Sequence, residues 1–133
     1  MIVADTNLIA YLLVPGQYTR QAEAVYRKDP QWSAPVLWRS EFRNVLVLSH
    51  RHGLIGKVEA LDIMEQAEQL MKGQAFEVES SRVLGLATTS GCSAYDCEFV
   101  ALAQHLGVPL VTSDHVLIAK FEPTAVSMGT FCS

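Results

Sequence analysis

Residues 2–7 read Ile-Val-Ala-Asp-Thr-Asn, an unbroken apolar run that ends in an acid followed by hydroxyl and amide side chains. Three consecutive apolar residues without polar alternation predict a strand covered on both faces, as in the middle of a parallel sheet. Asp5 then lies at the carboxyl end of that strand, where open α/β sheets bind their ligands. Alternatively, Asp5 only caps a short helix over residues 8–14, because Asp is a preferred N-cap residue. This stretch alone leaves both interpretations open.

The rest of the chain alternates between strand and helix patterns. Strands are predicted at residues 2–4, 32–34, 76–78, 110–112 and 125–128, and helices at 8–14, 19–28, 36–50, between 56 and 73, at 82–90, between 93 and 107, and at 115–121. Such alternation predicts an α/β fold of three layers (α/β/α), with a central, mainly parallel sheet and helices on both faces. We expect one domain spanning residues 1–133.

The amino-acid composition limits the kinds of protein that this chain can be. Hydrophobic residues make up 50% of the chain and charged residues 18%, which indicates a large core or an apolar face for a partner, such as a homodimer face. No apolar run reaches the roughly 20 residues of a membrane span and no signal peptide is evident, so we expect a cytoplasmic protein without a membrane partner. The three cysteines, Cys92, Cys97 and Cys132, lack metal-ligand spacing and are expected to be reduced thiols.

The formal net charge of −4 argues against a protein that binds nucleic acid mainly through global positive charge. It does not exclude a nuclease whose acids gather in one pocket, because a divalent cation reverses the local field there.

Two further acids lie within predicted helices. Glu41 shares a helix face with apolar residues three, four and seven positions away, so it points inward and needs a partner. Its alternatives are an exposed edge position or a salt bridge to a buried base. Asp96 stands three residues after Ser93, the spacing of a capping box, and this explains both residues structurally. The same geometry places an ionised Asp96 at the positive end of a helix, as a metal ligand requires.

Asp114 follows the strand at 110–112 as Asp5 follows the first strand, and it has the same alternative role as a helix cap. Right-handed crossovers place all strand ends at one edge of the sheet, so Asp5, Glu41, Asp96 and Asp114 are expected to meet there. Like charges at contact distance raise each other's pKa, and a divalent cation relieves that conflict. Carboxylate ligands without a His or Cys cluster favour Mg²⁺ or Mn²⁺.

Four motifs carry a resemblance to a known family, and they occur in the family's order over nearly the whole chain. They are Asp5-Thr6-Asn7, Glu41-x-x-Asn44, Tyr95-Asp96 leading into Phe99-Val-Ala-Leu-Ala103, and Val111-Thr112-Ser113-Asp114. Together they resemble the PIN domain, in particular the VapC-like toxins of bacterial toxin–antitoxin pairs. One departure is His115, where many relatives carry a basic or small residue, and this leaves its contribution to substrate binding open.

The resemblance implies that the four acids bind one or two Mg²⁺ or Mn²⁺ ions for hydrolysis of an RNA phosphodiester, without a side-chain nucleophile. It also implies a homodimer and a cognate antitoxin that covers the acids. The implied supporting groups are Thr6, Asn7, Thr112 and Ser113. Candidate phosphate-binding bases are Arg39, Arg43, Arg51 and Lys57.

Three rival interpretations compete with a nuclease. A magnesium-binding receiver module would carry paired acids after its first strand and a lysine after its last, and both are missing. A non-catalytic PIN scaffold for RNA or protein would not need all four acids. A haloacid-type phosphatase would need a second Asp at position 7, where Asn7 stands.

Overall fold

A computed structural model describes all 133 residues and contains one five-stranded sheet in the order β3-β2-β1-β4-β5. Every neighbouring pair of strands is parallel. The strands are β1 (Ile2–Ala4), β2 (Trp32–Pro35), β3 (Ala75–Phe76), β4 (Leu110–Val111) and β5 (Ala125–Val126). The predicted parallel sheet is therefore confirmed.

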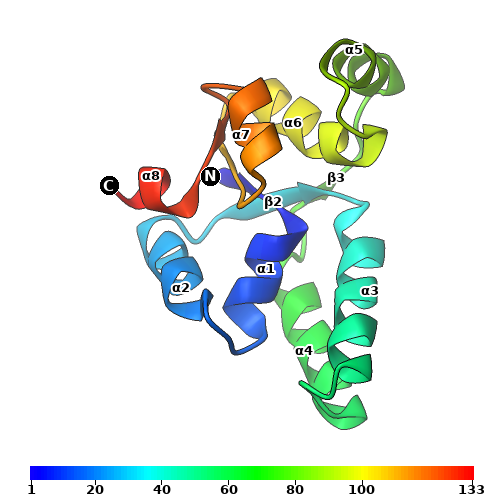
Figure 1. The fold of residues 1–133 in the computed structure, drawn as a ribbon, viewed down its shortest axis with the longest axis vertical. Coiled ribbons are helices and arrows are strands. Elements are labelled where there is room, and N and C mark those ends of the chain that lie inside the picture. The colour runs from blue at the N-terminus through cyan, green and yellow to red at the C-terminus, as the bar shows by residue number, and fades with distance from the viewer.

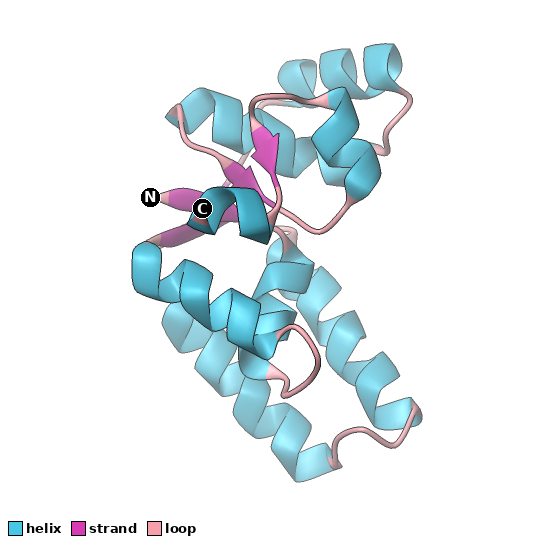
Figure 2. Ribbon diagram, turned by 60° about the vertical axis from the view of Figure 1, so that its left-hand side comes forward, coloured by secondary structure: helices cyan, strands magenta, loops and turns pink.

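Helices cover both faces of this sheet (Figures 1 and 2). One face carries α5, α6 and α7, and the other carries α1, α2, α3 and α4, with α8 beside α2 near the C-terminus. The helices are α1 (Thr6–Leu13), α2 (Thr19–Lys28), α3 (Trp38–Arg51), α4 (Lys57–Leu70), α5 (Ser80–Ser90), α6 (Ala94–Leu106), α7 (His115–Lys120) and α8 (Met128–Cys132). The three-layer α/β/α arrangement is confirmed.

The hydrophobic core lies between the two helical layers and includes 26 buried residues. All three residues of β1 are fully buried, as their unbroken apolar run predicted. From α6, Phe99, Val100 and Leu102 pack into the same core. None of the helices combines the length and apolar composition needed to cross a bilayer. All three cysteines are free thiols, as expected.

The strand order fixes where a ligand can approach. The chain runs outward from β1 to β2 and β3, then returns to the other side of β1 with β4 and β5. The strand order therefore reverses between β1 and β4. The carboxyl ends of these two strands flank the crevice where such sheets bind ligands. Asp5 follows β1 directly, and Thr112 follows β4.

Several predicted boundaries were wrong at short elements. The final strand ends at Val126, and residues 128–132 form α8, whose five residues are too few to show a periodic pattern. Ser127 begins α8 by accepting a hydrogen bond from the Thr130 amide (3.0 Å). β2 extends to Pro35 and α3 begins at Trp38, whereas the predicted strand ends at residue 34 and the predicted helix begins at residue 36. The amides on either side of Pro35 donate to the carbonyls of Gln74, directly before β3, and Phe76, so the missing proline N–H leaves no gap in the β2–β3 ladder.

Candidate active site

Asp5 occupies the N-cap position of α1, yet its carboxylate makes no capping hydrogen bond. It instead accepts a hydrogen bond of 2.6 Å from the hydroxyl of Thr112, a residue 107 positions away that is fully buried after β4. The capping interpretation of Asp5 is therefore wrong. Burial raises the pKa of Asp5, and the charges of Asp96 and Asp114 raise it further, while the Thr112 hydrogen bond opposes this rise.

Glu41 lies in the first turn of α3 and points inward, as its apolar helix face predicted. Its Oε1 accepts a hydrogen bond of 2.7 Å from the hydroxyl of Thr6, which is itself buried. Burial raises the pKa of Glu41, and the neighbouring charges of Asp5 and Asp96 add to the rise. The alternative of a salt bridge to a buried base is wrong, because the only ion pair in the chain joins the N-terminus to Asp29.

Asp96 lies in the first turn of α6, whose N-cap is Ser93. The Ser93 hydroxyl oxygen accepts a hydrogen bond of 3.0 Å from the Asp96 amide, so the predicted cap is confirmed. The Asp96 carboxylate does not return a hydrogen bond to the Ser93 amide. Burial raises the pKa of Asp96, and the charge of Asp114 raises it further.

Asp114 caps α7, so for this acid the structural interpretation is correct. Its Oδ1 accepts hydrogen bonds from the amides of Val116 (2.9 Å) and Leu117 (3.1 Å). The Asp114 amide in turn donates to the Thr112 hydroxyl oxygen (3.0 Å). Thr112 thus joins two acids at once, because it donates to Asp5 and accepts from Asp114.

Asp5 and Asp114 follow the carboxyl ends of β1 and β4, and Glu41 and Asp96 lie in the first turns of α3 and α6. The pKa values of Asp5, Glu41 and Asp96 are each raised in part by the charge of a neighbouring acid of this group, and no base pairs with any of the four. No group of three His, Cys, Asp or Glu side chains is already gathered into a ligand set for one ion. Four carboxylates without soft or imidazole donors nevertheless match the oxygen preference of Mg²⁺ and Mn²⁺, so the donor chemistry fits such an ion.

Three of the four predicted supporting residues lie in this hydrogen-bond network or beside it. Thr6 and Thr112 each donate to an acid. The Ser113 hydroxyl lies 3.1 Å from the hydroxyl of Tyr11. Asn7 is exposed, has no side-chain hydrogen bond to the acids, and lines a separate hollow between α1 and α3.

The candidate phosphate-binding bases do not contact the acids. Arg43, Arg51 and Lys57 line a hollow between α3 and α4. The guanidinium of Arg39 lies 5.7 Å from the ring centroid of Trp38.

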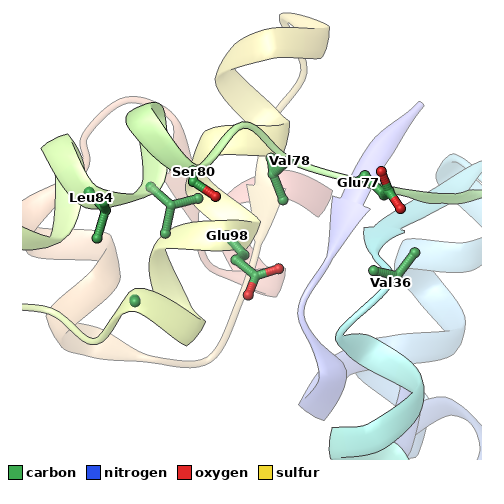
Figure 3. Close-up of a pocket in the computed structure, with 8 residues that line it drawn as sticks. Val36, Glu77, Val78, Ser80, Leu84 and Glu98 are labelled. Carbon is green, nitrogen blue, oxygen red and sulfur yellow. The ribbon is translucent and has the colours of Figure 1, made fainter.

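A further acid near the site, Glu98, is not among the residues predicted from the sequence. It is half-buried, burial raises its pKa, and its charge also raises the pKa of Glu41. Figure 3 shows its carboxylate extending from α6 into a hollow that is also lined by Val36 and Glu77. The periodicity of α6 gave no clear signal for this position, because Ala94, four residues before Glu98, is exposed, whereas Ala101, three residues after it, is buried.

Known proteins share both sequence and fold with this chain. It is 34% identical over 125 residues to Ribonuclease VapC3 from Pyrobaculum aerophilum, a match that covers 90% of this chain and 94% of that protein. The crystal structure of PAE2754 from Pyrobaculum aerophilum superposes with a TM-score of 0.77 at 21% identity, over 98% of this chain and 92% of that one. A toxin–antitoxin complex from Klebsiella pneumoniae gives a TM-score of 0.68 at 17% identity, over 96% and 98% of the two chains.

The family model of the PIN domain matches residues 2–121, a range that contains all four acids and both threonines that bind them. The fold, the order of the motifs and this match agree. The chain belongs to the PIN domain family.

Proposed function

We propose that this protein is an endoribonuclease that hydrolyses RNA phosphodiester bonds with a divalent cation, Mg²⁺ or Mn²⁺, held by its four acids. One observation carries this proposal: Asp5, Glu41, Asp96 and Asp114, from the ends of β1 and β4 and the first turns of α3 and α6, lie near one another without a compensating base. Uncompensated, partly buried carboxylates cost folding free energy, which indicates a functional site. The 34% identity to a protein named as a ribonuclease supports the same activity.

When bound, such an ion promotes ionisation of a water and offsets the negative charge of a phosphodiester. The protein's own groups fix the geometry. Thr112 orients one Asp5 oxygen, and Thr6 orients Oε1 of Glu41, which leaves Oε2 of Glu41 without a hydrogen bond from the chain. Because the pKa of Glu41 is raised, Oε2 is suited to orient the attacking water and accept its proton. No serine, threonine or cysteine nucleophile is required.

We also propose the biological setting of a toxin that is inhibited by a cognate antitoxin, as a single catalytic domain over residues 1–133 that acts on RNA in the cytoplasm. Likeness to a chain from a solved toxin–antitoxin complex supports the antitoxin. Exposed apolar side chains support a protein partner or a homodimer, among them Val47, Leu54, Val58 and Leu61 on α3, α4 and their connection.

Cleavage of total cellular RNA by the purified chain tests the proposal. With Mg²⁺ or Mn²⁺, the native protein is expected to cut RNA, while Asp5→Ala and Asp96→Ala, shown by circular dichroism to remain folded, are expected to be inactive. Removal of the metal with EDTA should stop cleavage, and re-addition should restore it. A native protein that binds metal without cutting RNA would instead favour the receiver or scaffold interpretations.

A further inference from the structure

A second hollow lies beside the acids, at the carboxyl ends of β4 and β5. It measures about 360 Å³, within the range of small-ligand sites. Thr112 and Ser113 form part of its wall, so it borders Asp5 and Asp114 through the residue that hydrogen-bonds to both. Ser127, which directly follows β5, also lines it.

The lining of this hollow contains no acid, lysine or arginine. Its aromatic and polar side chains include Tyr11, Tyr18, Gln21, Ser113 and His115. A wall without acids, lysine or arginine offers no fixed charge to a phosphate group or a metal ion, whereas an aromatic and polar wall suits a flat, uncharged group with hydrogen-bonding edges. In an RNA strand that group is the nucleobase.

Two tyrosines provide the flat surface. The rings of Tyr11 and Tyr18 lie with centroids 4.8 Å apart at an interplanar angle of 46°. The hydroxyl pair of Tyr11 and Ser113 anchors the inner ring to the end of β4. The outer ring, Tyr18, is 41% exposed, so its remaining surface is available for stacking.

Polar groups without partners surround these rings. The side chains of Gln21 and His115 are exposed and have no hydrogen-bond partner within the protein, and the hydroxyl of Tyr18 also has none. An amide and an imidazole offer donors and acceptors of the kind that read the edge of an unpaired base. His115 follows Asp114 directly, so a base held there lies next to the acids.

We propose that this hollow is a nucleobase subsite, in which an unpaired base of the RNA stacks on Tyr18 and is read by Gln21 and His115. The proposal rests on the ribonuclease function and specifies its substrate as single-stranded RNA with a splayed-out base beside the scissile phosphate. Tyr18 and its neighbours are thus specificity-determining residues that do not touch the reacting atoms.

Cleavage of a random-sequence RNA pool tests the subsite. Tyr18→Ala is expected to lower kcat/KM by about 5- to 150-fold, the loss produced by removing a stacking aromatic, and to flatten the base distribution at cut sites. Tyr18→Phe should retain most activity because the ring remains. Tyr26→Ala is the matched control, since Tyr26 is 37% exposed on α2 but packs edge-on against Trp32 outside the hollow. The proposal fails if Tyr18→Ala cuts with the native rate and base distribution.

Nucleoside binding to the full chain provides a readout independent of cleavage. Adenosine, guanosine, cytidine and uridine carry the base without phosphate, so the acids do not attract them. In NMR titrations, at least one nucleoside is expected to shift the amides of Tyr18, Gln21 and His115, and Tyr18→Ala should abolish this effect. Absence of shifts for all four, or shifts confined to other regions, would overturn the subsite. If the native protein does not cleave RNA at all, the ribonuclease function itself is contradicted.

Discussion

Two hollows flank the acids at the carboxyl edge of the sheet, and they differ in charge. The hollow beside β2 and β3 contains two carboxylates, Glu77 and Glu98, with apolar side chains around them (Figure 3). The hollow beside β4 and β5 is lined by aromatic, neutral polar and apolar groups and contains no carboxylate. The carboxylates of the first hollow repel a phosphate backbone, whereas the second hollow suits a base. We therefore expect RNA to bind on the β4 and β5 side of the acids.

The largest effect is expected at the acids between the two hollows. Asp5→Asn keeps an oxygen that accepts the Thr112 hydrogen bond but removes the charge. Substitution of a residue that only hydrogen-bonds to a metal ligand typically lowers activity by up to roughly 100-fold. We expect the rate of RNA cleavage by Asp5→Asn to fall by well over this factor. Initial rates with saturating Mn²⁺ measure this loss. A near-native rate of cleavage by Asp5→Asn would show that the charge of Asp5 is not needed, and it would contradict the acidic site between the two hollows.

Thr112→Val tests the residue that connects the acids to the neutral hollow. It removes the hydroxyl that donates to Asp5 and accepts from the Asp114 amide, with almost unchanged shape. We expect a 10- to 100-fold loss of activity and a stability loss of about 1–3 kcal/mol at neutral pH. Urea unfolding and initial rates measure both. Thr124→Val is the control, since its hydroxyl has no hydrogen bond, and an equal effect of both substitutions would refute a special role of Thr112.

Removing one charge from the acidic hollow is expected to have a smaller and opposite effect. Glu98→Gln leaves the four acids in place and lowers the repulsion of phosphate, so KM for RNA should fall by about two- to fivefold. Glu122→Gln is the matched control, because this exposed acid precedes β5 at the opposite edge of the sheet. A raised KM in Glu98→Gln would contradict the idea that this hollow disfavours RNA, and would make Glu98 a contributor to the site.

The pH dependence of stability tests whether the pKa of Asp5 is raised in the folded protein. Because burial raises the pKa of Asp5, the fold prefers the neutral carboxyl, and this stabilisation is complete below about pH 4 and disappears as pH rises through the raised pKa. Without metal, the Tm of native protein relative to Asp5→Asn should therefore fall as pH rises. Mn²⁺ should restore the Tm of the native protein only. A pH-independent difference in Tm would contradict the raised pKa.

The sequence was most informative where a pattern is long or a residue type is costly to bury. The apolar run of β1 and the inward face of α3 predicted the positions of Asp5 and Glu41, because an acid beside buried side chains needs a reason to be there. The capping spacing of Ser93 and Asp96 likewise predicted the start of α6. Local signals of this kind were sufficient for the parallel sheet and for the acids at its edge.

Long-range contacts could not be predicted in the same way. Thr112 was expected only as a supporting group, and its hydrogen bond to Asp5 spans 107 residues. Likewise, the hollow beside β4 and β5 combines Tyr11, Tyr18 and Ser127 from three segments, and none of them carries a local motif. The inward position of Glu98 depends on the space between α6 and the β2–α3 connection, which periodicity within α6 does not reveal.

The central claim is that the acids at the ends of β1 and β4 and at the start of α6 form a divalent-cation site. Calorimetric titration of Mn²⁺ into metal-free protein at pH 7 tests this claim most directly, beside Asp5→Asn and Asp96→Asn. The native protein should give saturable binding of one or two ions, and both variants should bind at least about tenfold more weakly. Native protein without binding, or variants with unchanged affinity, would contradict the assignment of these acids.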